Sequence, residues 1–262
     1  MIQWSRFRIS DGRLGFGVIV DERIVECDGD FYIGPRPTAV SFALDEVTLL
    51  SPCTPSKIVA LWNNFHALAA KLAKPVPRHP LFLIKPGSSL AGPGEAIARP
   101  AGYAGKIAFE GELGIVIGKP CKDVAESDAA DYILGYTCVN DVTAAEVLDA
   151  DANFTQWTRA KGYDTFGCIG PVIASDLDWP HARVVTKLDG VERQNYPLSD
   201  MVFSPAQQVS RISHDMSLMP GDVIACGTSL GVGSIKDGST VEVSIDGIGT
   251  LKNSLGEPRW LG

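Results

Sequence analysis

Two glutamates, Glu110 and Glu112, stand two positions apart in the mostly apolar stretch Lys106–Gly118. Side chains alternate between the two faces of a strand, so we expect both carboxylates on one face and an apolar core-packing face opposite. Same-face neighbours are roughly 7 Å apart at the backbone, and two carboxylates that close repel each other. A divalent cation between their tips would remove this conflict. The alternative is a pair of solvated glutamates on an exposed strand.

A third acidic residue and a lysine extend this candidate site. Asp141 ends the strand-like run Tyr136–Asp141, and Thr143–Leu148 looks helical. We therefore expect Asp141 at a strand-to-helix junction, where it is either a ligand-binding residue or an N-cap. Lys161 lies in Trp157–Gly167, which we predict to be a long irregular loop of the kind that is often functional. Lys161 is then a site cation or a salt-bridge partner.

Other residues suit contacts to an anion. Lys85 follows the strand candidate Leu81–Ile84 and precedes a Gly/Ser loop, so it is predicted to bind an anionic group or to lie on the surface. The glycine-rich loop Gly227–Gly233 lacks the Gly-Lys-Ser/Thr of a nucleotide-binding loop. Its backbone N–H groups and the Thr228 hydroxyl could instead hold a substrate carboxylate.

His66 is one of four histidines, at the start of the predicted helix Phe65–Ala73. It is a candidate catalytic base, although an isolated histidine is more often a structural hydrogen-bonding group.

The elements that must position these residues are mostly strands. Residues 1–55 are predicted to form a small β-rich N-terminal domain, in which the apolar run Val40–Leu50 packs inward, and residues 56–262 the catalytic domain. Helices are expected at Ser127–Leu134 and after Ser204-Pro205, where serine is the N-cap. Asp189-Gly190 is predicted to turn a hairpin. The fold class is therefore α+β and β-rich.

Composition excludes several function classes. The net charge is −8, which argues against nucleic acid or an anionic membrane as a partner. No apolar run approaches the ~20 residues that span a bilayer, and no signal peptide is recognised. The six cysteines include no Cys-x-x-Cys pair, so we expect a reduced, cytoplasmic protein without a cysteine zinc site. An anionic small-molecule substrate is compatible with this charge because a bound metal inverts the local field.

Four stretches together resemble the fumarylacetoacetate hydrolase family, in the family's order and at its usual separations. The resemblance covers roughly residues 55 to 262 and rests on Phe109–Gly118, Gly135–Ala144, Thr158–Gly167 and Pro220–Thr228. It implies a roll of stacked mixed sheets with a few short helices after a small N-terminal domain, usually in a homodimer.

The resemblance also implies roles for individual residues. Glu110, Glu112 and Asp141 would bind Mg²⁺ or Mn²⁺, and three oxygen ligands also suit Ca²⁺ better than zinc. Lys161 would neutralise developing negative charge beside the metal, and Thr228 would contact the substrate carboxylate. The implied substrate is a 2-oxo acid that chelates the metal.

One departure affects the reaction. Bacterial members of the family often carry a histidine with a glutamate three residues later, but His66 is followed by Ala69. Alanine cannot orient an imidazole or raise its basicity. The first hypothesis is a hydrolase or lyase that cleaves a C–C bond in a 2-oxo, dicarboxylic, acylpyruvate-like acid of a catabolic pathway. The alternatives are an isomerase or decarboxylase of such diacids, and a metal-binding protein with impaired catalysis.

Overall fold

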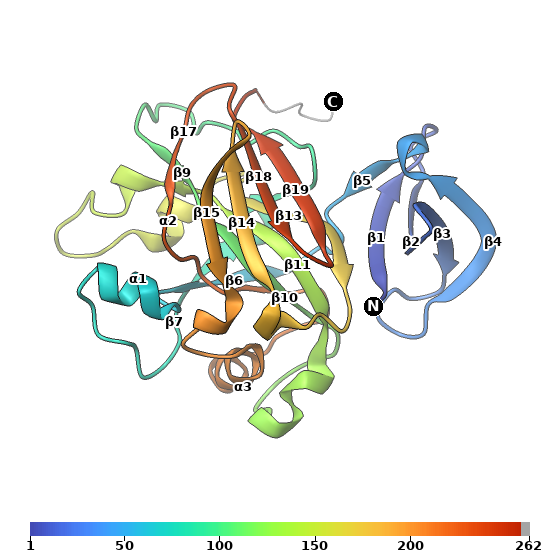
Figure 1. Cartoon of the computed structure of the whole chain (residues 1–262), viewed down its shortest axis with the longest axis horizontal. Helices are drawn as coiled ribbons and strands as arrows, with labels where there is room; N and C mark the ends of the chain where they lie inside the picture. The colour runs from blue at the N-terminus through green and yellow to red at the C-terminus, as the bar shows by residue number, and fades with distance from the viewer. Residues whose placement is uncertain (258–262) are drawn as a thin grey trace.

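The computed structural model describes residues 1–257, which form three β-sheets with a few short helices (Figure 1). The largest sheet has 12 strands, and its main path runs β4-β3-β2-β1-β13-β11-β10-β16-β6-β7, with β5 paired to β1 and β8 to β13. Its strands are β1 (Gln3–Arg8), β2 (Leu14–Val20), β3 (Arg23–Asp28), β4 (Arg36–Ala43), β5 (Thr48–Leu50), β6 (Lys57–Trp62), β7 (Leu81–Pro86), β8 (Leu90–Ala91), β10 (Gly111–Ile117), β11 (Ile133–Asp141), β13 (Gly167–Ala174) and β16 (Val223–Ala225).

Two smaller sheets pack beside it. A three-stranded sheet has the order β12-β9-β17 and a four-stranded sheet the order β15-β14-β18-β19. Their strands are β9 (Ile107–Phe109), β12 (Thr143–Ala144), β14 (Arg183–Leu188), β15 (Val191–Pro197), β17 (Gly233–Ile235), β18 (Thr240–Ile245) and β19 (Gly249–Ser254). Most pairs are antiparallel, but β16 runs parallel to β6 and β8 parallel to β13. The predicted β-rich fold of stacked mixed sheets is confirmed.

The helices are short. Within residues 1–257 the α-helices are α1 (His66–Lys71), α2 (Trp157–Lys161) and α3 (Pro205–Asp215), and the 3₁₀ segments are Leu44–Glu46, Gly87–Ser89, Glu126–Tyr132, Ala145–Val147, Trp179–His181 and Leu198–Asp200. In the described part of the chain no helix is long and apolar enough to cross a membrane.

The predicted strand Lys106–Gly118 is divided in two. β9 belongs to the three-stranded sheet and β10 to the large sheet, and the break falls at Glu110. There the Glu110 N–H donates to the side-chain Oδ1 of Asn140 at 3.1 Å. Every residue of β10 is buried, because β11 and β16 pair with its two edges and its alternating side chains pack into hydrophobic clusters on both faces of the sheet. The exposed-strand alternative for Glu112 is therefore wrong.

Two helix predictions and one loop prediction need correction. Thr143–Leu148 is not a helix but strand β12 followed by a 3₁₀ turn, so Asp141 is not a helix N-cap. Trp157–Gly167 is not wholly irregular, because α2 occupies its first five residues. Ser127–Leu134 is mainly the 3₁₀ segment Glu126–Tyr132, which has no side-chain cap. In each case tertiary packing overrides the local preference of the sequence.

Two other local predictions are confirmed. Ser204 caps α3, since its hydroxyl accepts from the Gln207 N–H at 3.3 Å while the Gln207 side chain accepts from the Ser204 N–H at 3.0 Å. Asp189 and Gly190 turn the β14–β15 hairpin with φ of 51° and 76°, as a two-residue turn of this kind requires.

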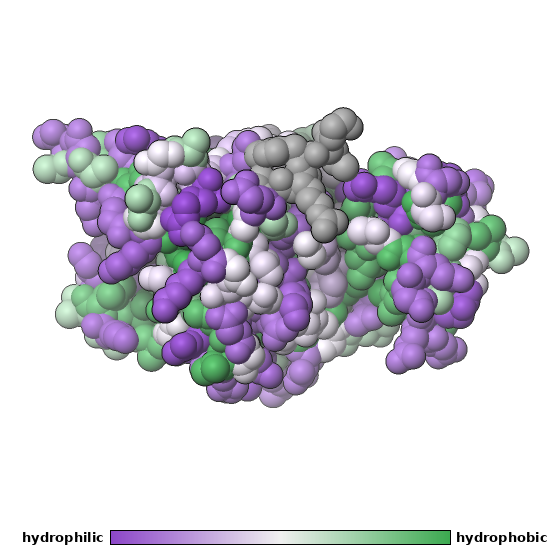
Figure 2. All heavy atoms as spheres, turned by 90° about the horizontal axis from the view of Figure 1, so that it is seen from above, coloured by the Kyte–Doolittle hydropathy of each residue, from purple (hydrophilic) through white to green (hydrophobic). Residues whose placement is uncertain are grey.

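The N-terminal strands β1–β4 form a lobe at one end of the molecule (Figures 1 and 2). The lobe continues the large sheet, because Gln3 and Trp4 of β1 pair with Ala174 and Ile173 of β13. The prediction that Val40–Leu50 packs inward holds poorly, since most of β4 is exposed and Val40 is 45% exposed. β4 is the terminal strand of the sheet, so few elements can cover it.

Candidate metal centre

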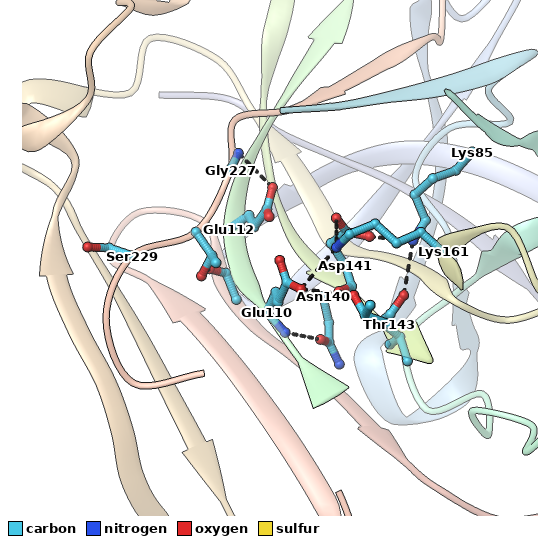
Figure 3. A network of polar contacts seen from close by, with 12 residues as sticks. Lys85, Glu110, Glu112, Asn140, Asp141, Thr143, Lys161, Gly227 and Ser229 are labelled. Atoms are coloured by element: carbon cyan, nitrogen blue, oxygen red, sulfur yellow. Dashed lines mark hydrogen bonds and ion pairs between the residues drawn. The ribbon is translucent and has the colours of Figure 1, made fainter. Parts of the chain in front are cut away.

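Three carboxylates meet where the small and large sheets join. One ligand oxygen from each of Glu110, Glu112 and Asp141 lies within 4.8 Å of the other two (Figure 3). Asp141 reaches Glu110 because β10 and β11 pair with Gly111 opposite Asn140, and the Asp141 N–H donates to the Glu110 carbonyl at 2.9 Å. The sequence prediction that these three residues form one site agrees with this geometry.

Two lysines enclose Asp141. Lys161, at the end of α2, donates to Asp141 Oδ2 at 2.6 Å and to Glu110 Oε1 at 3.0 Å. Lys85, near the end of β7, donates to Asp141 Oδ1 and, at 3.3 Å, to the Val142 carbonyl. Lys85 is fully buried, so the alternative prediction that it lies on the surface is wrong. Its ammonium group faces Asp141 in this structure.

The pKa shifts follow from this arrangement. Burial alone would raise the pKa of Asp141, but the charges of Lys161 and Lys85 outweigh it and lower that pKa. Burial also opposes the charge on Lys161, yet the carboxylates of Asp141, Glu110 and Glu112 raise its pKa. The pKa of Lys85 is lowered, mainly by burial and further by the nearby Lys161 charge, against the opposing effect of Asp141. These shifts favour the charged forms of both Asp141 and Lys161.

Glu112 is the carboxylate that most requires a cation. It is fully buried; its Oε2 accepts from the Gly227 N–H at 2.8 Å, while its Oε1 has no hydrogen-bond partner among the described residues. Burial, with the charges of Asp141 and Glu110, raises its pKa well above the ordinary value. A divalent cation would satisfy the free oxygen and favour the ionised form. The three oxygen donors therefore fit Mg²⁺, Mn²⁺ or Ca²⁺.

Neighbouring side chains hold Glu110. The Thr143 hydroxyl donates to Glu110 Oε1 at 2.9 Å, beside the Lys161 ammonium group. Thr143 lies two positions after Asp141, and the two side chains are buried together. Sequence reasoning missed Thr143 because the residue was expected to begin a helix.

The loop after β16 closes another side of the centre. The Gly227 N–H contacts Glu112, and the Thr228 hydroxyl donates to the Gly111 carbonyl at 3.0 Å. Gly227 has a φ of +88°, a conformation that favours glycine. Ser229 is 1% exposed and its hydroxyl has no partner among the described residues. The predicted contact of Thr228 with a substrate carboxylate stays a prediction.

His66 lies at the first position of α1 and is exposed, whereas Ala69 is buried. Within residues 1–257 the His66 side chain forms no hydrogen bond or ion pair. The preceding Asn64 is anchored near the centre, because its side chain donates to the Cys226 carbonyl at 2.8 Å. Among the described residues, His66 therefore has no acidic partner that would take over the role of the glutamate missing at position 69.

A pocket of about 460 Å³ lies between the start of α1 and the loop after β16. It is lined by Ala67, Arg193, Asn195, Tyr196, Pro197, Asp200, Ser229, Leu230 and Gly231. In Figure 3 the Ser229 side chain points away from the three carboxylates. None of the three carboxylates lines this pocket.

Two domain families match the chain. Residues 57–255 match the family described as fumarylacetoacetate (FAA) hydrolase C-terminal, and residues 3–52 match the Rv2993c-like N-terminal family. The chain belongs to the fumarylacetoacetate hydrolase family. The resemblance inferred from the four sequence stretches is thereby confirmed.

Relatives extend over nearly the whole chain. An uncharacterized protein of Archaeoglobus fulgidus is 44% identical over 247 residues, which cover 94% of this chain and 93% of the relative. The structure of 2-hydroxyhepta-2,4-diene-1,7-dioate isomerase from Mycobacterium marinum is 38% identical with a TM-score of 0.89 and covers 98% and 99% of the two chains. Maleylpyruvate hydrolase from Sphingobium sp. SYK-6, in complex with manganese(II) and pyruvate, is 27% identical with a TM-score of 0.78 and covers 98% and 100%.

Proposed function

We propose that this member of the fumarylacetoacetate hydrolase family is a divalent-metal-dependent hydrolase or lyase. Its substrate would be a 2-oxo acid, dicarboxylic and acylpyruvate-like, from a catabolic pathway, in which it cleaves a C–C bond. The observation that carries the proposal is the meeting of Glu110, Glu112 and Asp141 within 4.8 Å, with Lys161 against two of them. The manganese and pyruvate bound by the Sphingobium relative support the same chemistry.

Glu110, Glu112 and Asp141 would hold Mg²⁺ or Mn²⁺. When bound, such a cation supplies Lewis-acid polarisation of the oxygens of a 2-oxo acid. Lys161 contributes a fixed positive charge that stabilises negative charge developing on the substrate, in a buried place where water screens little. The Gly227 N–H is already donated to Glu112, so Thr228 and the residues after it in the loop would orient the substrate carboxylate through their backbone N–H groups. His66 is the candidate proton carrier.

A second candidate is an isomerase or decarboxylase of 2-oxo diacids. It is favoured by the exposed His66 without an acidic partner and by Ala69, because these reactions need no residue that activates water. The M. marinum isomerase, 38% identical, supports it as well.

The test is a spectrophotometric screen with added Mn²⁺ of acylpyruvates, oxaloacetate and dienol diacids. Cleavage of an acylpyruvate supports the first candidate; turnover of only the other two classes supports the second. Mn²⁺ binding without any turnover would leave a metal-binding protein with impaired catalysis. His66→Ala should abolish acylpyruvate hydrolysis and spare oxaloacetate decarboxylation, and an equal loss of both would refute the role given to His66.

The six cysteines are free and buried. They support the further proposal that the enzyme works in a reducing compartment, the cytoplasm.

A further inference from the structure

We infer that Gln194 is a positioning residue that joins the metal-binding strand to the loop after β16 and fixes the direction of the Thr228 hydroxyl. This inference rests on the proposed function, because it assigns Gln194 a role at the same centre. Gln194 lies in β15, a strand of the four-stranded sheet that supplies none of the three carboxylates. The side chain is 1% exposed.

Gly111 is the residue through which Gln194 reaches the carboxylates. It lies between Glu110 and Glu112, and its N–H donates to Gln194 Oε1 at 2.9 Å. Its carbonyl accepts from the Tyr196 hydroxyl at 2.6 Å and from the Thr228 hydroxyl at 3.0 Å. Side chains from β15 and from the loop therefore hold both polar groups of the residue that separates the two glutamates.

The orientation of the Gln194 amide follows from the backbone. A peptide N–H can only donate, so the amide oxygen of Gln194 must face Gly111. The amide nitrogen then faces Thr228, whose Oγ1 it reaches at 2.8 Å. Because this nitrogen can only donate, Thr228 Oγ1 accepts here, and its own proton is directed to the Gly111 carbonyl.

The direction of the Thr228 proton limits which hydrogen-bond donors the loop after β16 can present to a substrate. The Thr228 hydroxyl has its proton committed to Gly111 and can give a ligand only a lone pair. Donors to a substrate carboxylate must then be backbone N–H groups of the loop. The Gln194 nitrogen also lies 3.4 Å from the carbonyls of Ser229 and Leu230, so the same amide restrains the next two residues of the loop.

Burial makes this network sensitive to the loss of one partner. Removing the Gln194 amide would leave the Gly111 N–H without its side-chain acceptor and Thr228 Oγ1 without its donor in a site that excludes water, which is costly. The strand and the loop would relax, and Glu110 and Glu112 would move with Gly111. Groups that orient metal ligands typically change metal affinity by about 10–100-fold when they are removed.

The test is the Mn²⁺ dissociation constant, measured by calorimetry on full-length protein stripped of metal. Gln194→Leu should weaken Mn²⁺ binding at least about tenfold, although Gln194 touches no carboxylate. Gln208→Leu is the matched control, because Gln208 in α3 is equally buried but its amide donates to Met201 Sδ and to the Phe203 carbonyl, which precede that helix. It should bind Mn²⁺ within about twofold of the wild type. Thermal unfolding of both variants checks that they are folded.

A double-mutant cycle separates this role from a general loss of stability. Thr228→Val should also weaken Mn²⁺ binding, and Gln194→Leu/Thr228→Val should bind no more than about twofold more weakly than Gln194→Leu, because the two residues act through one network. Additive losses, or wild-type Mn²⁺ affinity in Gln194→Leu, would overturn the inference. A failure of the proposed function appears instead as absent turnover in the substrate screen, with these affinities still measurable.

Discussion

At the scale of single residues, the properties of the candidate metal centre follow from the charges of its side chains more than from any single hydrogen bond. Three carboxylates and two lysines are packed together, and Glu112 is the member whose charge is least compensated. The spacing of Glu110 and Glu112 within an apolar stretch was enough to make them candidates, whereas Asp141 and Lys161 were assigned to the same site through the family resemblance. The sequence could not predict that Lys85 lies against Asp141 or that Gln194 reaches Gly111, since those contacts join segments far apart in the chain.

Glu112 makes metal binding depend on pH. Its pKa in the folded, metal-free protein lies well above the ordinary value of about 4.3. Folding therefore favours the neutral acid, and the metal-free protein should lose stability as pH rises from about 4.3 through the raised pKa. Mn²⁺ needs the ionised form, so its affinity should rise with pH, by up to about tenfold per unit, until that raised pKa is passed.

Calorimetry in two buffers of different ionisation enthalpy measures this proton release. Glu112→Gln is the control and should bind Mn²⁺ weakly with little dependence on pH. Equal Mn²⁺ affinity of the wild type at pH 5 and pH 8 would contradict the account of Glu112.

Lys85 should contribute more to the free energy of unfolding than a single ion pair ordinarily does. Lys85→Met leaves Asp141 Oδ1 buried without its partner, and breaking a buried pair on one side costs roughly 3–5 kcal/mol. Urea unfolding of the metal-free protein measures this cost. Lys57→Met is the comparison, because Asp222 keeps donors from Ser56, Met219 and the residue-57 backbone after the lysine is lost. Lys57→Met should lower the free energy of unfolding by clearly less than Lys85→Met does. Equal losses of stability in the two variants would argue against a special role for Lys85.

At the scale of elements, hairpins and the capped helix α3 could be predicted, whereas the break at Glu110 could not. A turn or a helix cap is determined by residues close together in the sequence. The division of the apolar stretch between two sheets depends instead on distant residues. The side-chain oxygens of Asn140 and Gln194 accept from the backbone N–H groups of Glu110 and Gly111, respectively. The short helix α2 was missed for a similar reason. Its five residues gain their stability from packing, with Ala160 and Lys161 buried.

Gly111 is a backbone position where neighbouring elements approach closely. A Cβ atom added there would lie 2.0 Å from Thr186 Oγ1 and 3.2 Å from Gln194 Oε1, so the strand or these buried side chains must shift. Gly111→Ala should therefore lower Mn²⁺ affinity at least about tenfold, as loss of ligand orientation does, and reduce thermal stability. Gly256→Ala, where an added Cβ meets no atom within 4 Å, should change neither. Wild-type Mn²⁺ affinity in Gly111→Ala would show that this strand tolerates displacement.

At the scale of the whole molecule, the N-terminal lobe carries an unusual share of exposed apolar side chains. In Figure 2 hydrophobic residues gather on its surface, and the large exposed ones are Met1, Ile2, Leu14, Val20, Ile33, Val40 and Leu44. Exposed apolar surface of this kind often marks a protein contact. The boundary near residue 55 stays a prediction, and β1 joins this lobe to the main sheet through β13.

The homodimer predicted from the family resemblance is consistent with that surface. Light scattering during size-exclusion chromatography should give twice the mass of one chain. A mass equal to one chain across a range of protein concentrations would contradict the prediction.

The central claim is that Glu110, Glu112 and Asp141 together bind one divalent cation. Calorimetric titration of metal-stripped protein with Mn²⁺ tests it most directly. We expect one Mn²⁺ per chain in the wild type and loss of most of that affinity in Glu110→Ala and in Asp141→Ala. Unchanged Mn²⁺ affinity in both variants would contradict it.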